Sequence, residues 1–264
     1  MPPVFSVSAE QLNLWLVAFL WPFVRMLALI STAPVFGESS VPRKTKVGLA
    51  ALLAITMAPT LGALPPVPLV SAGGIWILIQ QILIGAAMGF SMRLVFTIVQ
   101  AAGEYASLQM GLSFASFFDP TSGGNTMVVS RLLNVMAILV FLAVDGHLAL
   151  ITTLAESFHT LPIADAPLAA GGWFRLATAG QQIFVGGLML ALPLIATLLT
   201  LNLAMGILNR VSPQFSIFAV GFPITLLAGL AMLQMLMQYL VPFLEPRFAQ
   251  GFTLIDHVLQ GLRP

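Results

Sequence analysis

The sequence predicts an all-α integral membrane protein that crosses the bilayer several times. Of its 264 residues, 59% are hydrophobic and only 7% are charged, whereas about a quarter of the residues in an ordinary soluble domain are charged. The apolar residues form continuous runs that reach about twenty residues, which is the length of a membrane-spanning helix. A spanning β-strand would show about ten residues of alternating character instead, so these runs predict helices.

Six apolar stretches are the predicted helical segments. They cover residues 12–35, 47–64, 75–99, 127–144, 183–208 and 215–244. The first stretch ends around Pro34 and Gly37, and the second ends before Pro65 and Pro66, because proline and glycine terminate helices. The last two stretches are separated only by residues 209–214, so they are predicted to form a helical hairpin.

Glycine and proline interrupt several of these stretches, which indicates contact with protein rather than with lipid alone. A proline frees a backbone carbonyl that hydrocarbon cannot satisfy. Gly85 and Gly89 stand four residues apart, a spacing that lets two helices approach closely, and ordinary packing within the chain also fits this pattern. The candidate helix-packing positions are Gly85, Gly89, Pro193, Gly221 and Pro223.

Composition and spacing exclude several classes of function. Ten Lys and Arg balance nine Asp and Glu for a net charge of +1, which argues against nucleic-acid binding. The chain has no cysteine, so it has no disulfides and no thiolate metal ligands. Acidic and histidine residues gather near the end of the fourth stretch without the spacing of a known metal motif. No catalytic, metal-binding or cofactor-binding residue is therefore predicted.

Arg25 lies near the middle of the first stretch, where an unpaired guanidinium would cost several kcal/mol. It therefore requires a partner or water. Glu38 is thirteen residues away, roughly 20 Å along a helix, so the expected counter-charge is Glu104, Asp145 or a residue of another subunit. A purely structural pair and a functional role both remain open for Arg25.

The segment at residues 109–125 is unusually apolar for a loop, with three phenylalanines flanked by glycines. Exposure of this much apolar surface to water is unfavourable, while the glycines and Pro120 disfavour a long helix. One interpretation is an interfacial loop whose phenylalanines anchor it among lipid headgroups. The alternative is a hydrophobic plug, since apolar side chains can close a pore by excluding water.

Several motifs, in this order and spacing, resemble the FliR family of type III secretion export-gate components, including its virulence counterparts (SctT). The resemblance extends over nearly the whole chain. It comprises Arg25 together with residues 33–37 (APVFG), 41–46 (VPRKTK), 102–104 (AGE), 109–111 (QMG), 119–120 (DP), 145–147 (DGH), 157–158 (SF) before Pro162, 192–193 (LP), 209–214 (NRVSPQ) and 218–223 (FAVGFP).

The resemblance implies a non-catalytic subunit of an export gate without cofactors. One such subunit would join several FliP and FliQ subunits in a hetero-oligomeric helical ring, with FlhB and FlhA as further partners. The ring would pass unfolded flagellar proteins through the bacterial inner membrane at the base of the flagellar basal body. Residues 1–177 would resemble FliP, and residues 178–264 would resemble the FliQ helical hairpin.

The resemblance also assigns roles to particular residues. The plug of the closed channel would comprise Met110, Gly111, Leu112, Phe114, Phe117 and Phe118, and the candidate subunit contacts are Arg210, Pro213 and Gln214. Two positions depart from the expected family pattern. Gln81 stands where an acidic residue is expected, and Thr225 stands where a lysine is expected.

Two other functions are compatible with the same residues. A virulence secretion subunit would share the motifs of a flagellar one. A stand-alone secondary transporter would also place an intramembrane charge such as Arg25 among helices interrupted by glycine and proline. Copurification with FliP-like and FliQ-like proteins would distinguish the gate from the transporter.

Overall fold

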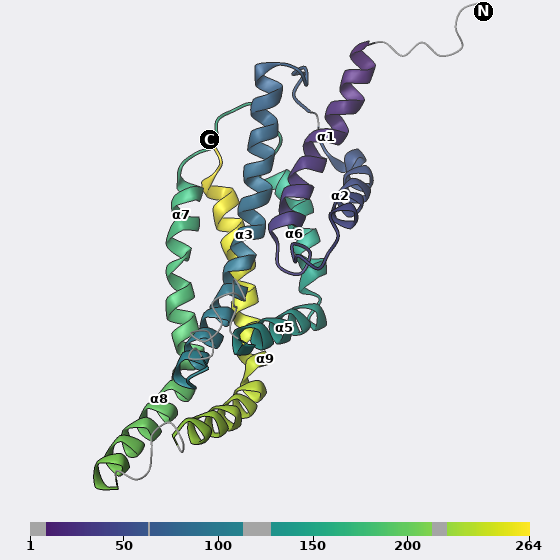
Figure 1. Ribbon diagram of the computed structural model, residues 1–264. Coiled ribbons are helices and arrows are strands. Elements are labelled where there is room, and N and C mark those ends of the chain that lie inside the picture. The colour runs from purple at the N-terminus through teal and green to yellow at the C-terminus, as the bar shows by residue number, and fades with distance from the viewer. Residues whose placement is uncertain (1–8, 63, 113–127, 213–220) are drawn as a thin grey trace, which may run out of the picture. The chain divides into compact units, whose positions relative to one another are not determined.

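The computed structural model describes residues 9–62, 64–112, 128–212 and 221–264 (Figure 1). Every regular element in these ranges is a helix, which confirms the all-α prediction. The elements are α1 (Ala9–Thr32), α2 (Arg43–Met57), the short 3-10 helix η1 (Ala58–Thr60), α3 (Ala72–Gln109), α5 (Val128–Ala143), α6 (Gly146–Thr160), α7 (Gly171–Ala179), α8 (Gln181–Val211) and α9 (Phe222–Gly261).

Four helical segments of the described chain are long and apolar enough to cross a membrane. They are Asn13–Thr32, Ala72–Gln109, Gly171–Val211 and Phe222–Gly261. A fifth span results if α5 and α6, which are bent by 68° at their junction, act as one. The second apolar stretch corresponds to α2, whose 15 residues reach only about 22 Å at 1.5 Å per residue. That length is shorter than a hydrocarbon core of about 30 Å.

The junction between α5 and α6 is made by Asp145, which stands at the N-cap position of α6 without a side-chain capping bond. Its φ angle of 56° lies in the left-handed region. Aspartate adopts this conformation more readily than most residues because its short polar side chain can bond locally. The Asp145-Gly146 pair therefore places the sharp bend directly after the fourth predicted stretch, which ends at residue 144.

Several helical regions lie outside the predicted stretches: α6, α7, residues 100–109 of α3 and the part of α9 beyond residue 244. These regions are amphipathic rather than uniformly apolar. The end of α9 buries Phe248, Ile255 and Val258 while Asp256 on the same helix is exposed. A search for continuous apolar runs misses such helices, because only one face of them is apolar.

The chain divides into two compact units built from interleaved segments. The first unit comprises Met1–Arg93, Asp145–Thr178 and Gln250–Pro264, and the second comprises Leu94–Val144 and Ala179–Ala249. Neither unit coincides with residues 1–177 or 178–264. The proposed likeness of those two portions to FliP and FliQ remains a prediction.

The core of the first unit forms where α1 packs on the beginning of α3. A Cβ atom at Gly85 would lie against the carbonyl oxygen of Arg25 and 2.9 Å from the Cβ of Ala28. A Cβ at Gly89 would lie against the hydroxyl of Thr32 and 2.8 Å from the nitrogen of Ala33. The structure thus places the two glycines where the backbones of α1 and α3 approach closely.

Aromatic rings and small residues build the core of the second unit. The rings of Phe96, Phe141 and Phe248, from α3, α5 and α9, lie 5.1 to 5.7 Å apart between centroids. The helices also approach closely at Gly103, where a Cβ would lie 2.7 Å from the backbone nitrogen of Ser130. These contacts pack α3, α5 and α9 against one another in the core of the second unit.

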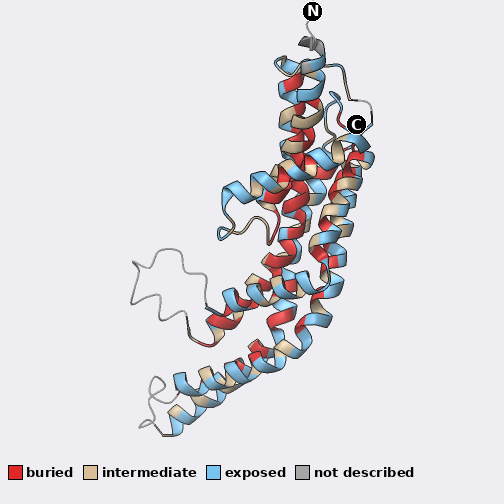
Figure 2. Cartoon of the chain, turned by 90° about the vertical axis from the view of Figure 1, so that its right-hand side faces the viewer, coloured by how far each residue is buried: buried red, intermediate tan, exposed pale blue. Residues whose placement is uncertain are grey.

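Helices α8 and α9, which form the predicted hairpin, are buried by the rest of the chain to a much smaller extent than α3. Within the most apolar window of each segment, 67% of the residues of Ala72–Gln109 are buried, but only 33% in Gly171–Val211 and 22% in Phe222–Gly261. Figure 2 shows exposed residues predominating along α8 and the first part of α9. These apolar faces require lipid or protein to cover them, since large exposed apolar surfaces are unfavourable in water.

Candidate functional site

Arg25 on α1 is completely buried, with none of its surface exposed. Its Nε donates a hydrogen bond to Oε1 of Gln81 at 2.7 Å. Its Nη1 donates to the carbonyl oxygen and the hydroxyl of Ser157 at 3.1 and 3.2 Å, and Nη2 donates to the carbonyl of Leu161 at 3.0 Å. The guanidinium carbon lies 4.2 Å from the centre of the Phe158 ring, within the range of a cation–π contact.

These contacts place the guanidinium at the carboxyl end of α6. Helix α6 ends at Thr160, where the last carbonyls lack helical partners and the helix dipole is negative. Arg25 therefore caps α6 from α1, while Gln81 connects the same group to α3. The arrangement ties three helices of the first unit together through one side chain.

The expectation of an in-chain carboxylate partner for Arg25 is wrong for the described residues. Every group hydrogen-bonded to it there is an amide, a hydroxyl or a backbone carbonyl. Both proposed partners, Glu104 and Asp145, are exposed. The positive charge is met by dipoles and an aromatic face, and this geometry supports the structural interpretation of Arg25.

The departure at Gln81 is explained by the same contact. Gln81 is 1% exposed and supplies the acceptor for Nε of Arg25. A neutral amide is sufficient there because carbonyls at the end of α6 also accept hydrogen bonds from the guanidinium. The other departure, Thr225, is 7% exposed and bonds locally to the carbonyl of Phe222.

The beginning of the predicted plug segment is a well-defined helix terminus. Helix α3 ends at Gln109, and Gly111 follows with a φ angle of 76°. The amide N–H of Leu112 donates to the carbonyl oxygen of Ser107 at 3.0 Å. The amide N–H of Gly111 donates to the carbonyl oxygen of Leu108 at 3.2 Å. This pair of bonds is the Schellman arrangement, which favours glycine at the left-handed position.

Met110 anchors this terminus inside the second unit. Its side chain is completely buried and lies over Gly229 of α9. A Cβ at Gly229 would be 2.5 Å from Cγ and 2.9 Å from Sδ of Met110. A side chain at Gly229 would force Met110 to move, so the position where the plug segment begins is coupled to α9.

The remaining predicted residues fall into two groups. Phe114, Phe117, Phe118, Pro213 and Gln214 lie outside the described residues, so their roles stay predictions. Pro193 lies inside α8, and Arg210 is exposed in the last turn of that helix. There its charge complements the helix dipole, and its role in subunit contact also stays a prediction.

The structure changes the interpretation of two residues near the start of α9. Gly221 precedes the helix, and Pro223 is its second residue. A proline in the first turn needs no backbone N–H, so it does not break the helix. The prolines inside α9 are Pro242 and Pro246, which the sequence interpretation had not singled out.

Sequence reasoning identified none of the partners of Arg25 and did not identify the partner of Met110. Examples are Ser157, which accepts from Arg25, and Gly229, which accommodates Met110. Ser157 is 132 positions from Arg25 and Gly229 is more than a hundred from Met110. The only sequence signal was an isolated glycine in an apolar helix, which indicates a packing reason without naming the partner.

Comparison with known proteins covers nearly the whole chain. The profile described as "Bacterial export proteins, family 1" matches residues 16–251. The "Flagellar biosynthetic protein FliR" of Pectobacterium carotovorum subsp. carotovorum is 53% identical, with 97% of each chain covered. The proteins of the same name from Escherichia coli K12 and Aquifex aeolicus are 48% and 26% identical, and each comparison covers at least 98% of both chains.

Proposed function

The chain belongs to the bacterial export proteins, family 1, and we propose that it is a non-catalytic subunit of the flagellar type III export gate. Its similarity to the FliR proteins makes it a membrane protein of the flagellar export apparatus. In the proposed gate it works with FliP and FliQ subunits, and with FlhB and FlhA, in the bacterial inner membrane. Unfolded flagellar proteins are the substrates.

The observation that carries the gate proposal is similarity over almost the full length of proteins named for flagellar biosynthesis. The relatives compared above carry the flagellar name, which favours the flagellar over the virulence system. The uncovered apolar faces of α8 and α9 support assembly with other subunits, since they require partners or lipid. The transporter alternative loses its main support, because Arg25 donates to Gln81, Ser157 and Leu161.

We further propose that the loop beginning at Met110 is the plug of the closed gate. In this mechanism Phe114, Phe117 and Phe118 exclude water from the lumen, and the loop moves aside when a substrate or partner opens the ring. The fixed terminus at Met110 to Leu112 supports the proposal, because a plug must begin from a defined position. The terminus is held by the backbone bonds of Leu112 and Gly111 and by the burial of Met110.

Replacement of Phe114, Phe117 and Phe118 by serine is expected to make the assembled gate leak ions. Small polar side chains would let water fill the lumen and remove the apolar barrier. The measurement is ion permeability, or growth in high salt, of cells that contain the assembled complex. Copurification of the other subunits provides the control for assembly. Normal permeability in a correctly assembled complex would contradict the plug.

Gly229→Leu should produce a similar leak from a position outside the loop. The new side chain would occupy the place of Met110 and displace the start of the plug segment, with a stability loss of about 1–3 kcal/mol from overpacking. The matched control is Gly206→Leu on α8, where a Cβ would meet no atom within 4 Å. Equal ion permeability of the two variants would show that Met110 does not position the plug.

A further inference from the structure

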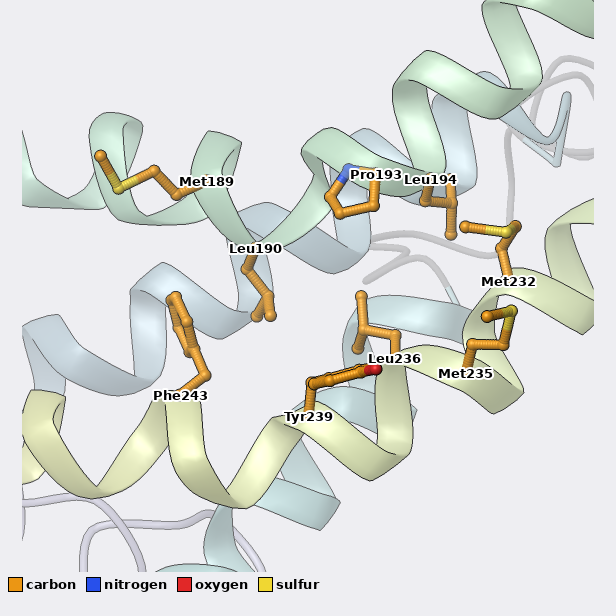
Figure 3. Close-up of a pocket in the computed structure, with 9 residues that line it drawn as sticks. All are labelled: Met189, Leu190, Pro193, Leu194, Met232, Met235, Leu236, Tyr239 and Phe243. Carbon is orange, nitrogen blue, oxygen red and sulfur yellow. The ribbon is translucent and has the colours of Figure 1, made fainter.

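A groove in the second unit runs between α8 and α9, and we propose that it binds an acyl chain of an anionic phospholipid (Figure 3). Its volume is about 240 Å³. Helix α8 contributes one wall and α9 the other. Leu190, Pro193 and Leu194 of α8 face Leu236, Tyr239 and Phe243 of α9 across the gap. The lining residues are Met189, Leu190, Pro193, Leu194, Met232, Met235, Leu236, Tyr239 and Phe243.

The groove has the chemistry of a hydrocarbon site. None of its nine lining residues is charged, and three are methionines, whose flexible side chains adapt to an irregular ligand. Leu190 and Leu194 form a buried floor, while Met189, Met235 and Tyr239 form an exposed rim. An apolar chain can therefore enter from the side and contact a fully apolar floor.

The length of the groove matches one leaflet of a bilayer. Met232 and Phe243 line it at positions eleven residues apart on α9, which is about 16 Å at 1.5 Å per residue. Half of a hydrocarbon core of about 30 Å is about 15 Å. Both helices belong to segments long and apolar enough to span a membrane, so an acyl chain has access to the groove.

A cation lies at one end of this apolar path. Arg247 is one turn beyond Phe243 on α9, and its guanidinium carbon is 5.3 Å from the centre of the Phe243 ring. Its Nη2 also lies 3.8 Å from Sδ of Met189 on α8. Arg247 thus touches both walls at one end of the groove, and arginine recognises phosphate through several N–H donors.

Other charges of the hairpin do not oppose an anion there. Glu245 is two residues from Phe243, about 200° around the helix, so it points away from the groove. Arg210 is at the far end of α8, and residues 181–209 of that helix carry no charge. An apolar path with a cation at one end fits a single anionic amphiphile better than an entirely apolar partner helix.

The experiment is native mass spectrometry of the full-length protein, together with any subunits that copurify, during titration with phosphatidylglycerol or phosphatidylcholine of identical acyl chains. Phosphatidylglycerol should bind about fivefold more tightly, since one arginine near an anionic surface contributes about 1 kcal/mol. Arg247→Gln should abolish this preference. Met235→Trp should fill the groove and reduce the occupancy of both lipids.

Two control variants leave the groove intact. Arg131→Gln removes an exposed cation from α5, and Leu227→Trp adds a ring at an exposed position of α9 outside the groove. Both should bind lipid as the unaltered protein does. The proposal is overturned if Arg247→Gln keeps the headgroup preference or if Met235→Trp keeps full lipid occupancy. Loss of a copurifying subunit from Met235→Trp at unchanged lipid occupancy would assign the groove to a partner helix instead.

The lipid site does not depend on the proposed export role. Its residues belong to the hairpin helices, whereas the plug proposal concerns the segment that begins at Met110. A failure of the lipid titration would therefore leave the ion-leak experiment unaffected, and the reverse also holds.

Discussion

Arg25→Met is expected to lower the free energy of unfolding by about 2–4 kcal/mol. The substitution leaves Oε1 of Gln81 and the carbonyl of Leu161 buried without the donor that serves them, and each buried unsatisfied group costs about 1–3 kcal/mol. It also removes the cation from the negative end of α6. Thermal unfolding of the detergent-solubilised protein measures the effect as a lower midpoint temperature.

Two further variants separate charge from geometry at this position. Arg25→Lys should recover only part of the loss, because one ammonium group cannot reproduce the three donor positions of a guanidinium. Arg131→Met removes an exposed arginine of α5 and should change stability by no more than about 0.5 kcal/mol. If Arg25→Met unfolds at the same temperature as the unaltered protein, Arg25 does not tie α1, α3 and α6 together.

Gly85→Ala is the second substitution with a large expected effect, a loss of about 1–3 kcal/mol from overpacking. The added methyl group would press on the carbonyl of Arg25 and lie 2.9 Å from the Cβ of Ala28. Because the obstacle includes the backbone of α1, the whole helix must move to make room. The same thermal-unfolding measurement tests this result.

The control for Gly85 is Gly48→Ala on α2, where an added Cβ would meet no atom within 4 Å. Alanine is favoured over glycine inside a helix by about 0.5–1 kcal/mol, so Gly48→Ala should stabilise the protein. Both substitutions gain the same helix propensity, and a difference in sign therefore isolates the contact between α1 and α3. A stabilised Gly85→Ala variant would show that the two helices can separate without cost.

The membrane helices were predictable because the property that defines them is local. A run of about twenty apolar residues is incompatible with water wherever it occurs in the chain. The amphipathic helices α6 and α7 were not predicted, because their stability depends on the neighbours that cover one face. The fourth predicted stretch ended at residue 144, next to the bend, but the left-handed conformation of Asp145 was not predicted, since hydropathy carries no information on a single φ angle.

For the same reason, the sequence predicted that Arg25 needs a partner but did not predict which groups supply it. A buried cation in an apolar helix demands a partner, and this demand could be read from α1 alone. The nature of the partner depended on the end of α6 and on Gln81, which lie 132 and 56 positions from Arg25. The expectation of a carboxylate failed because the backbone carbonyls at the end of a helix can satisfy a guanidinium, and such carbonyls carry no signature in the side-chain sequence.

The sequence by itself determined that this protein is a helical membrane protein, since hydrophobicity and the absence of charge act residue by residue along each segment. Its motifs also pointed to the export family to which it belongs. The tertiary structure alone decided which glycine accommodates Met110, which dipoles hold Arg25, and which side chains form the groove between α8 and α9. These features arise from contacts between residues distant in the chain, and their energies depend on three-dimensional packing rather than on sequence order.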